Sequence, residues 1–135
     1  MAEQSGKTVL AVNVGNGLTR FGFFSGGDLL GTWDAATPAA ITEDEARAKA
    51  CSVVDEILGG YRTPDGAILS CVVPAHANVW ARALSGMAAT RALVVGPGLR
   101  CGVRMRQDDP SGVGADRVAN VAAAQERYGA PVVVV

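Results

Sequence analysis

Two short stretches carry residue types suited to handling a phosphorylated ligand. The first, residues 13–17, reads Asn-Val-Gly-Asn-Gly and directly follows an apolar run. A glycine-rich turn between strands lets backbone amides approach a phosphate with no side chain in the way, so Gly15, Asn16 and Gly17 are candidates to receive the terminal phosphates of a nucleotide. An ordinary hairpin stays open as the alternative, because Asn-Gly is a favoured two-residue hairpin turn that needs no ligand.

The second stretch, residues 112–117, reads Gly-Val-Gly-Ala-Asp-Arg at an expected helix start. Amide groups around Gly114 and the guanidinium of Arg117 would favour an anionic ligand there. The alternative is an ordinary acidic first turn, with Asp116 and Arg117 both solvated. Together with the valine run at 132–135, which resembles a strand cut short, the two stretches suggest one half of a phosphotransfer site.

Hydrophobic periodicity and turn residues predict the elements that must position these stretches. Thr42 and Glu45 have capping-box spacing, and Gly59 follows the last apolar position, so both ends of one helix are signalled. The expected strands are 8–14, 19–24, 29–33, 67–73, 91–95 and 132–135, and the expected helices start at 42, 75 and 111.

Length and composition restrict the protein class. The chain has 135 residues, is 49% hydrophobic and carries a formal net charge of −1. One folded domain is expected, with no electrostatic reason to bind nucleic acid. No apolar run approaches the roughly 20 residues of a membrane span, so we expect a cytoplasmic protein. The cysteines, which are Cys51, Cys71 and Cys101, show neither disulfide nor zinc spacing and are expected to be buried free thiols.

The order of elements predicts an α/β fold. Three strands in succession, followed by alternating helices and strands, require a mixed sheet of about five strands with helices on its faces. This order resembles the actin-like (ribonuclease H-like) ATPase domain. We expect a flexible tail over residues 1–7, the actin-like domain over 8–130, and over 131–135 the first strand of a second domain that the 135 residues do not include.

Four motifs in order resemble those of type III pantothenate kinase, and the resemblance extends over about residues 8–135. The motifs are residues 14–16, 70–74, 94–98, and 108–110 followed by 114–117. The resemblance implies ATP-dependent phosphorylation of pantothenate at the start of coenzyme A synthesis. It also implies Mg²⁺ and a monovalent cation, K⁺ or NH₄⁺, that the missing half would mainly bind.

The resemblance also assigns roles to individual residues. Asp116 would be the catalytic carboxylate that orients the primary hydroxyl of pantothenate and accepts its proton. The pantothenate-binding residues would be Gly114, Asp116, Arg117 and Gln107. The residues that bind the ATP phosphates would be Asn13, Gly15, Asn16 and Gly17. No residue of this chain is assigned as a metal ligand, and the lone His76 is given no catalytic role.

Three positions depart from the family pattern. Asn13 stands where the family has Asp, Gly17 where it has Thr, and Gln107 where it has Tyr. The first replaces a charged oxygen that would help to hold Mg²⁺ with a neutral one, and the second removes a hydroxyl donor to phosphate. A weakened nucleotide site is therefore expected.

Two hypotheses follow. In the first, the chain is a subunit of a split, heteromeric pantothenate kinase, and a partner chain supplies the second domain and covers the strand 132–135. In the second, it is a noncatalytic regulatory or scaffolding subunit derived from a kinase half. Retention of Asp116 and Arg117 favours the first, whereas Asn13, Gly17 and Gln107 favour the second.

Overall fold

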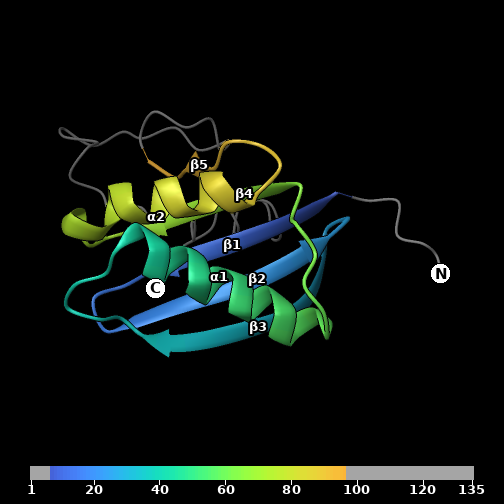
Figure 1. Ribbon diagram of the computed structural model, residues 1–135, viewed down its shortest axis with the longest axis horizontal. Coiled ribbons are helices and arrows are strands. Elements are labelled where there is room, and N and C mark those ends of the chain that lie inside the picture. The colour runs from blue at the N-terminus through green and yellow to red at the C-terminus, as the bar shows by residue number, and fades with distance from the viewer. Residues whose placement is uncertain (1–6, 97–135) are drawn as a thin grey trace, which may run out of the picture.

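The computed structural model describes residues 7–96, which form one sheet and two helices. The elements in chain order are β1 (Thr8–Val14), β2 (Leu18–Ser25), β3 (Asp28–Ala36), α1 (Glu43–Leu58), β4 (Gly66–Cys71), α2 (Pro74–Met87) and β5 (Leu93–Val94). The sheet has the strand order β3-β2-β1-β4-β5. Figure 1 shows α1 and α2 together on one face of this sheet.

The sheet is mixed, as the sequence predicts. β1 pairs antiparallel with β2 and parallel with β4, while β2 pairs antiparallel with β3 and β4 pairs parallel with β5. Alternate residues of a strand point to opposite faces, and in β1 those that point toward the helices, Leu10, Val12 and Val14, are fully buried. The buried, central position of β1 therefore fixes the position of the glycine turn that follows its carboxyl end.

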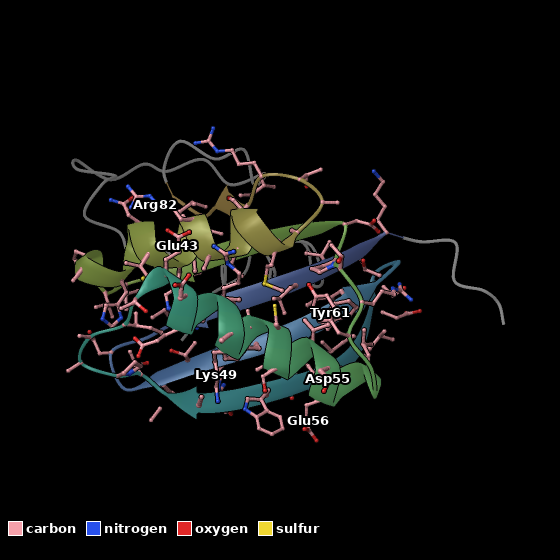
Figure 2. All side chains as sticks on the ribbon, in the orientation of Figure 1. Glu43, Lys49, Asp55, Glu56, Tyr61 and Arg82 are labelled. Carbon is pink, nitrogen blue, oxygen red and sulfur yellow. The ribbon has the colours of Figure 1, made fainter. Side chains whose placement is uncertain are left out.

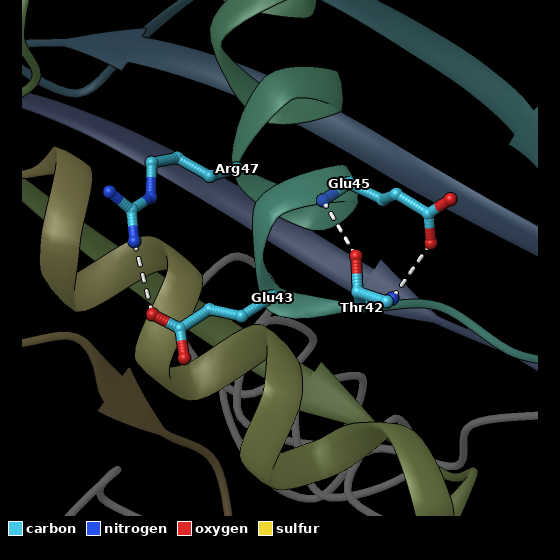
Figure 3. A network of polar contacts seen from close by, with 4 residues as sticks. All are labelled: Thr42, Glu43, Glu45 and Arg47. Carbon is cyan, nitrogen blue, oxygen red and sulfur yellow. Dashed lines mark hydrogen bonds and ion pairs between the residues drawn. The ribbon is translucent and has the colours of Figure 1, made fainter.

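Helix α1 begins and ends at local signals in the sequence. Thr42 Oγ1 accepts a hydrogen bond from the Glu45 amide at 3.1 Å, and Glu45 Oε1 accepts one from the Thr42 amide at 2.9 Å (Figure 3). Arg47 forms an ion pair with Glu43 one turn earlier, at 3.0 Å. At the other end Gly59 has φ 70°, the left-handed conformation that ends many helices.

The core lies between the sheet and the two helices. Phe21 of β2 packs against Trp80 of α2 with a ring-centroid distance of 5.8 Å. The small buried residues Ala46 and Ala50 let α1 approach the sheet closely. The outer surface of α1 is polar, with exposed Lys49, Asp55 and Glu56 (Figure 2). Within residues 7–96, no helix is both long and apolar enough to cross a membrane.

Several expected boundaries were wrong by a few residues. The third strand extends to Ala36 rather than ending at Trp33, because as the edge strand it is mostly exposed and gives little hydrophobic signal. β4 ends at Cys71 rather than Val73, because Pro74 already opens α2 and the chain must turn before it. The final strand shrinks from residues 91–95 to Leu93–Val94. The helix expected from Ser111 and the strand 132–135 lie outside the described residues.

Candidate functional site

The glycine turn lies at the end of the sheet where several elements converge. Because β1 and β4 are parallel and β3 runs in the same direction as β1, the carboxyl ends of all three strands meet at this end. The Val72 amide, just after β4, donates to the Val14 carbonyl at 3.0 Å. In open α/β sheets, ligands bind outside the carboxyl ends of strands. The expected phosphate turn is thus at the end of the sheet where a ligand is expected.

The turn at residues 15–17 forms a hairpin, but not the one that Asn-Gly favours. The Gly15 amide donates to the Leu18 carbonyl at 2.9 Å, which closes the loop around Asn16 and Gly17. The favoured primed turn requires positive φ at both central residues, and neither Asn16 nor Gly17 has positive φ. The local preference of the dipeptide therefore does not account for this conformation.

Thr37, directly after β3, contacts the turn and was missed by the sequence analysis. Its hydroxyl donates to the Gly15 carbonyl at 2.8 Å. Its backbone amide donates to the Gly17 carbonyl at 3.1 Å. A Thr 22 residues away in sequence, behind an exposed edge strand, gives no local signal for such a contact.

Two amide groups of the turn have no partner in the described part of the chain. Asn16 and Gly17 are exposed, and within residues 7–96 neither amide donates a hydrogen bond. Gly15 has no room for a side chain, since a Cβ there would lie 3.0 Å from the Leu18 carbonyl oxygen. Gly17 is open, because a Cβ there would meet nothing within 4 Å. Two such amides in an exposed turn can donate to an anion.

Asn13 lies in a polar row on the sheet face opposite the helices. Cross-strand pairing aligns Asn13 with Arg20 on one side and with Ser70 on the other, and Arg20 with Asp34. Arg20 Nε lies 3.5 Å from Asp34 Oδ2. A cavity of about 340 Å³ on this face is lined by Asn13, Arg20 and Ser70 together with mainly apolar residues.

Two oxygens in this row lack hydrogen-bond partners among the described residues. Asn13 Oδ1 and Ser70 Oγ are both buried and unpaired. They are neutral, hard oxygen atoms of the type that Mg²⁺ accepts, without the charge of a carboxylate. The described part of the chain holds no cluster of three or more His, Cys, Asp or Glu able to bind a metal on its own. The two oxygens could therefore contact a magnesium ion that is already bound to a nucleotide. Their affinity for that ion would be low, because neither carries a charge.

Other reactive groups in the described region have structural surroundings. His76 is 3% exposed, and its Nε2 lies 3.3 Å from the Ala39 carbonyl. Cys51 and Cys71 are free thiols, as expected, but they are half-buried rather than buried. Burial raises the pKa of the Cys71 thiol, so this group stays protonated at neutral pH. None of the three resembles an activated nucleophile.

The residues assigned to pantothenate lie outside the described range. Asp116, the expected catalytic residue, falls there with Gly114, Arg117 and Gln107, and Cys101 does as well. The structure brings together the ATP-side residues Asn13, Gly15, Asn16 and Gly17 at one strand end. The roles of both sets stay predictions.

Comparison with known proteins identifies the family. The family model for type III pantothenate kinase matches residues 9–135. The type III pantothenate kinase of Brevibacillus brevis is 32% identical over 127 residues, which are 94% of this chain and 50% of the relative. The corresponding protein of Nocardioides is 36% identical over 132 residues, covering 94% and 49%. The chain thus spans about half the length of the curated relatives it matches.

A solved structure supports the fold. The ROK hexokinase of Thermus thermophilus superposes with a TM-score of 0.55 at 19% identity, over 91% of this chain and 38% of the hexokinase. The expected actin-like α/β fold is confirmed. The chain belongs to the type III pantothenate kinase family and corresponds to the N-terminal half of its members.

Proposed function

We propose that this chain is the N-terminal half of a pantothenate kinase that transfers a phosphoryl group from ATP to pantothenate. The observation that carries the proposal is the family match over residues 9–135. The described geometry supports it, because the glycine turn at the carboxyl end of the central strand β1 presents two amides that have no partner within residues 7–96. A role in coenzyme A biosynthesis follows from the same match.

In this proposal the turn receives the ATP phosphates. The Asn16 and Gly17 amides donate to phosphate oxygens, and Gly15 lets the turn close tightly enough to present them. Asn13 faces the Mg²⁺ that accompanies ATP and offers it a neutral oxygen. Mg²⁺ neutralises charge on the transferring phosphoryl group when it is bound.

Asp116 is the proposed catalytic residue, and its part is to orient the pantothenate hydroxyl and accept its proton. Gly114 and Arg117 are proposed to hold the pantothenate carboxylate, with Gln107 in the wall of the same pocket. Phosphoryl transfer needs positioning more than early deprotonation, so a carboxylate of ordinary basicity is sufficient.

A partner chain is proposed to supply the second domain. The relatives are about twice as long as the matched region, and the rest of the family's catalytic cleft is proposed to come from residues beyond these 135. The partner would contribute most of the monovalent cation site and the other wall of the nucleotide cleft. The proposed assembly is a heteromer located in the cytoplasm.

The test is reconstitution. The 135-residue chain is mixed with a chain bearing the second domain, and ATP-dependent formation of phosphopantothenate is measured. We expect turnover by the mixture and none by either chain alone. Asp116→Ala should abolish turnover, and Asp116→Asn should retain binding of pantothenate without turnover. An Asp116→Ala complex with an unchanged rate would contradict the assignment.

A noncatalytic subunit is the second candidate, and the neutral Asn13 favours it. A subunit kept for scaffolding would bind the partner chain without contributing to catalysis. The same mixture separates the two: stoichiometric binding with no dependence of turnover on residues 13–17 or on Asp116 supports the scaffold.

A further inference from the structure

Thr37, just after the edge strand β3, makes two hydrogen bonds to the glycine turn and a third to Thr19 of β2. Its hydroxyl oxygen lies 2.8 Å from the Gly15 carbonyl oxygen and 2.9 Å from Thr19 Oγ1. Its amide lies 3.1 Å from the Gly17 carbonyl. The carbonyl groups of Gly15 and Gly17, the residues on either side of Asn16, are therefore bound by one residue.

The direction of these hydrogen bonds follows from counting protons. A hydroxyl group has one hydrogen, and a carbonyl oxygen can only accept, so the hydrogen of Thr37 goes to Gly15. Thr19 must then donate to Thr37. The hydroxyl of Thr19 is held in place because this residue is 3% exposed. The result is a directed chain, Thr19 to Thr37 to Gly15, in which each bond polarises the next.

This series of hydrogen bonds accounts for a conformation that the Asn-Gly dipeptide does not favour by itself. Asn-Gly prefers positive φ at both positions in a two-residue hairpin, and neither residue has it here. The turn carbonyls are instead engaged by Thr37, while the amides of Asn16 and Gly17 stay without partners in the described region. This arrangement suits an anion-binding turn, because the Gly15 and Gly17 carbonyls are occupied and two amides are available.

We infer that Thr37 is a positioning residue of the nucleotide site, which holds the turn of residues 15–17 in the conformation that presents the Asn16 and Gly17 amides to phosphate. This inference rests on the proposed function. Thr37 itself does not touch the nucleotide. It acts through the two carbonyl groups of the turn.

The test compares hydroxyl removal at Thr37 with hydroxyl removal elsewhere. Thr37→Val removes the donor to Gly15 and keeps the side-chain shape, while Thr37→Ser keeps the donor. Thr90→Val is the matched control, because Thr90 Oγ1 also donates to a carbonyl, that of Asp65, at 2.9 Å. Asp65 precedes β4, so the control bond lies at the opposite end of the sheet.

In the reconstituted kinase, Thr37→Val should lower kcat/KM for ATP about tenfold and leave KM for pantothenate unchanged, as expected for one lost hydrogen bond. Thr37→Ser should stay within about twofold of the wild type, and so should Thr90→Val.

Thr19→Val, which removes only the donor to Thr37, should have a smaller effect in the same direction. This variant keeps the test usable if Thr37→Val folds poorly. Unchanged ATP kinetics in Thr37→Val, or an equal loss in Thr90→Val, would overturn the inference.

A second measurement on the 135-residue chain does not depend on turnover. In amide NMR spectra, Thr37→Val should shift the signals of Gly15, Asn16 and Gly17 and leave those of the 26–27 turn in place. Titration with Mg·ATP should move the Asn16 and Gly17 signals in the wild type and move them much less in Thr37→Val. If the reconstituted wild type does not phosphorylate pantothenate, the proposed function has failed, and this titration still decides the role of Thr37. An equal response of both proteins to Mg·ATP, or no response of the wild type, overturns it.

Discussion

The two hairpin turns of the first three strands are built by different means. The turn between β2 and β3 has Gly26 at φ 59° and Gly27 at φ 91°, the values of a primed two-residue turn. The turn between β1 and β2 has no positive φ, and Thr37 holds its carbonyl groups. The first has the φ values that its own two glycines favour, with one added hydrogen bond from the Gly26 amide to the Lys7 carbonyl, whereas the second depends on a residue beyond the next strand.

This difference distinguishes the β2–β3 turn, which only connects two strands, from the β1–β2 turn, which is part of the candidate site. A primed glycine turn matches the twist of its strands and needs no support from other parts of the chain. A turn whose conformation is not set by its own dipeptide depends on tertiary contacts, which here come from Thr37. The fold therefore supports the turn at the carboxyl end of β1 and leaves the Gly26–Gly27 turn to local preference.

The largest expected effect comes from closing the space at Gly15. In Gly15→Ala the new Cβ would lie 3.0 Å from the Leu18 carbonyl oxygen, which belongs to the backbone and cannot move alone. The turn must shift, and we expect a loss of about 100-fold in kcat/KM for ATP in the reconstituted kinase. Gly17→Ala is the control, since its Cβ would meet nothing within 4 Å. Equal losses in both variants would show that the effect does not come from the close approach at Gly15.

Restoring the family residues should strengthen the same turn. Asn13→Asp with Gly17→Thr adds a charged oxygen beside Mg²⁺ and a hydroxyl donor to phosphate, and the side chain at 17 has room. We expect about tenfold tighter binding of Mg·ATP, measured by calorimetry. Without Mg²⁺, the carboxylate introduced by Asn13→Asp would be largely buried and should lower the melting temperature, and Mg²⁺ should reverse that loss.

The two single variants show how much of the gain in Mg·ATP affinity comes from contact with the metal and how much from contact with the phosphate. Asn13→Asp alone should gain affinity only when Mg²⁺ is present, whereas Gly17→Thr alone should gain without it. No gain from either variant would favour the noncatalytic subunit over the kinase.

Changes at the other turn should affect folding and leave catalysis intact. Gly27→Ala places a side chain at φ 91°, which should cost about 1 kcal/mol in the free energy of unfolding. The melting temperature should fall by about 4 °C, while kcat/KM for ATP stays unchanged. Gly26→Asn is the control, since Asn tolerates φ near the 59° observed there. A change in ATP kinetics from Gly27→Ala would remove the distinction between the two turns.

The sequence predicted those parts of the fold whose signals are local. Thr42 with Glu45, and Gly59 at the other end, gave both ends of α1. An apolar run that ends at a Gly/Asn turn gave β1 with its observed bounds, Thr8–Val14. The end of β3 was missed because an exposed edge strand has no apolar alternation to follow.

The candidate site was predictable only in part. Gly15, Asn16 and Gly17 were recognisable as a glycine turn, and their position after β1 is confirmed. The conformation of that turn was not predictable from Asn16 and Gly17, because it depends on the long-range contact with Thr37. Ser70 was not recognised as a neighbour of Asn13 because strand register, rather than any local pattern, brings them together.

The smallest expected effect lies at the other end of β1, where Asp65 binds Thr8. Asp65 Oδ2 accepts from the Thr8 amide at 2.8 Å and from Thr8 Oγ1 at 3.2 Å. These hydrogen bonds hold the pKa of Asp65 below its ordinary value, so the contribution to stability is present above about pH 4 and is lost as pH falls through the lowered pKa of the folded state.

We expect the melting temperature of Asp65→Asn to fall less steeply than that of the wild type on acidification below about pH 4, with Glu56→Gln on the exposed surface of α1 as the control. ATP kinetics at neutral pH should be unchanged in Asp65→Asn, because this end of β1 only anchors the strand, whereas the other end presents the turn. Identical acid profiles of wild type and Asp65→Asn would show that the Thr8 contact does not stabilise the fold.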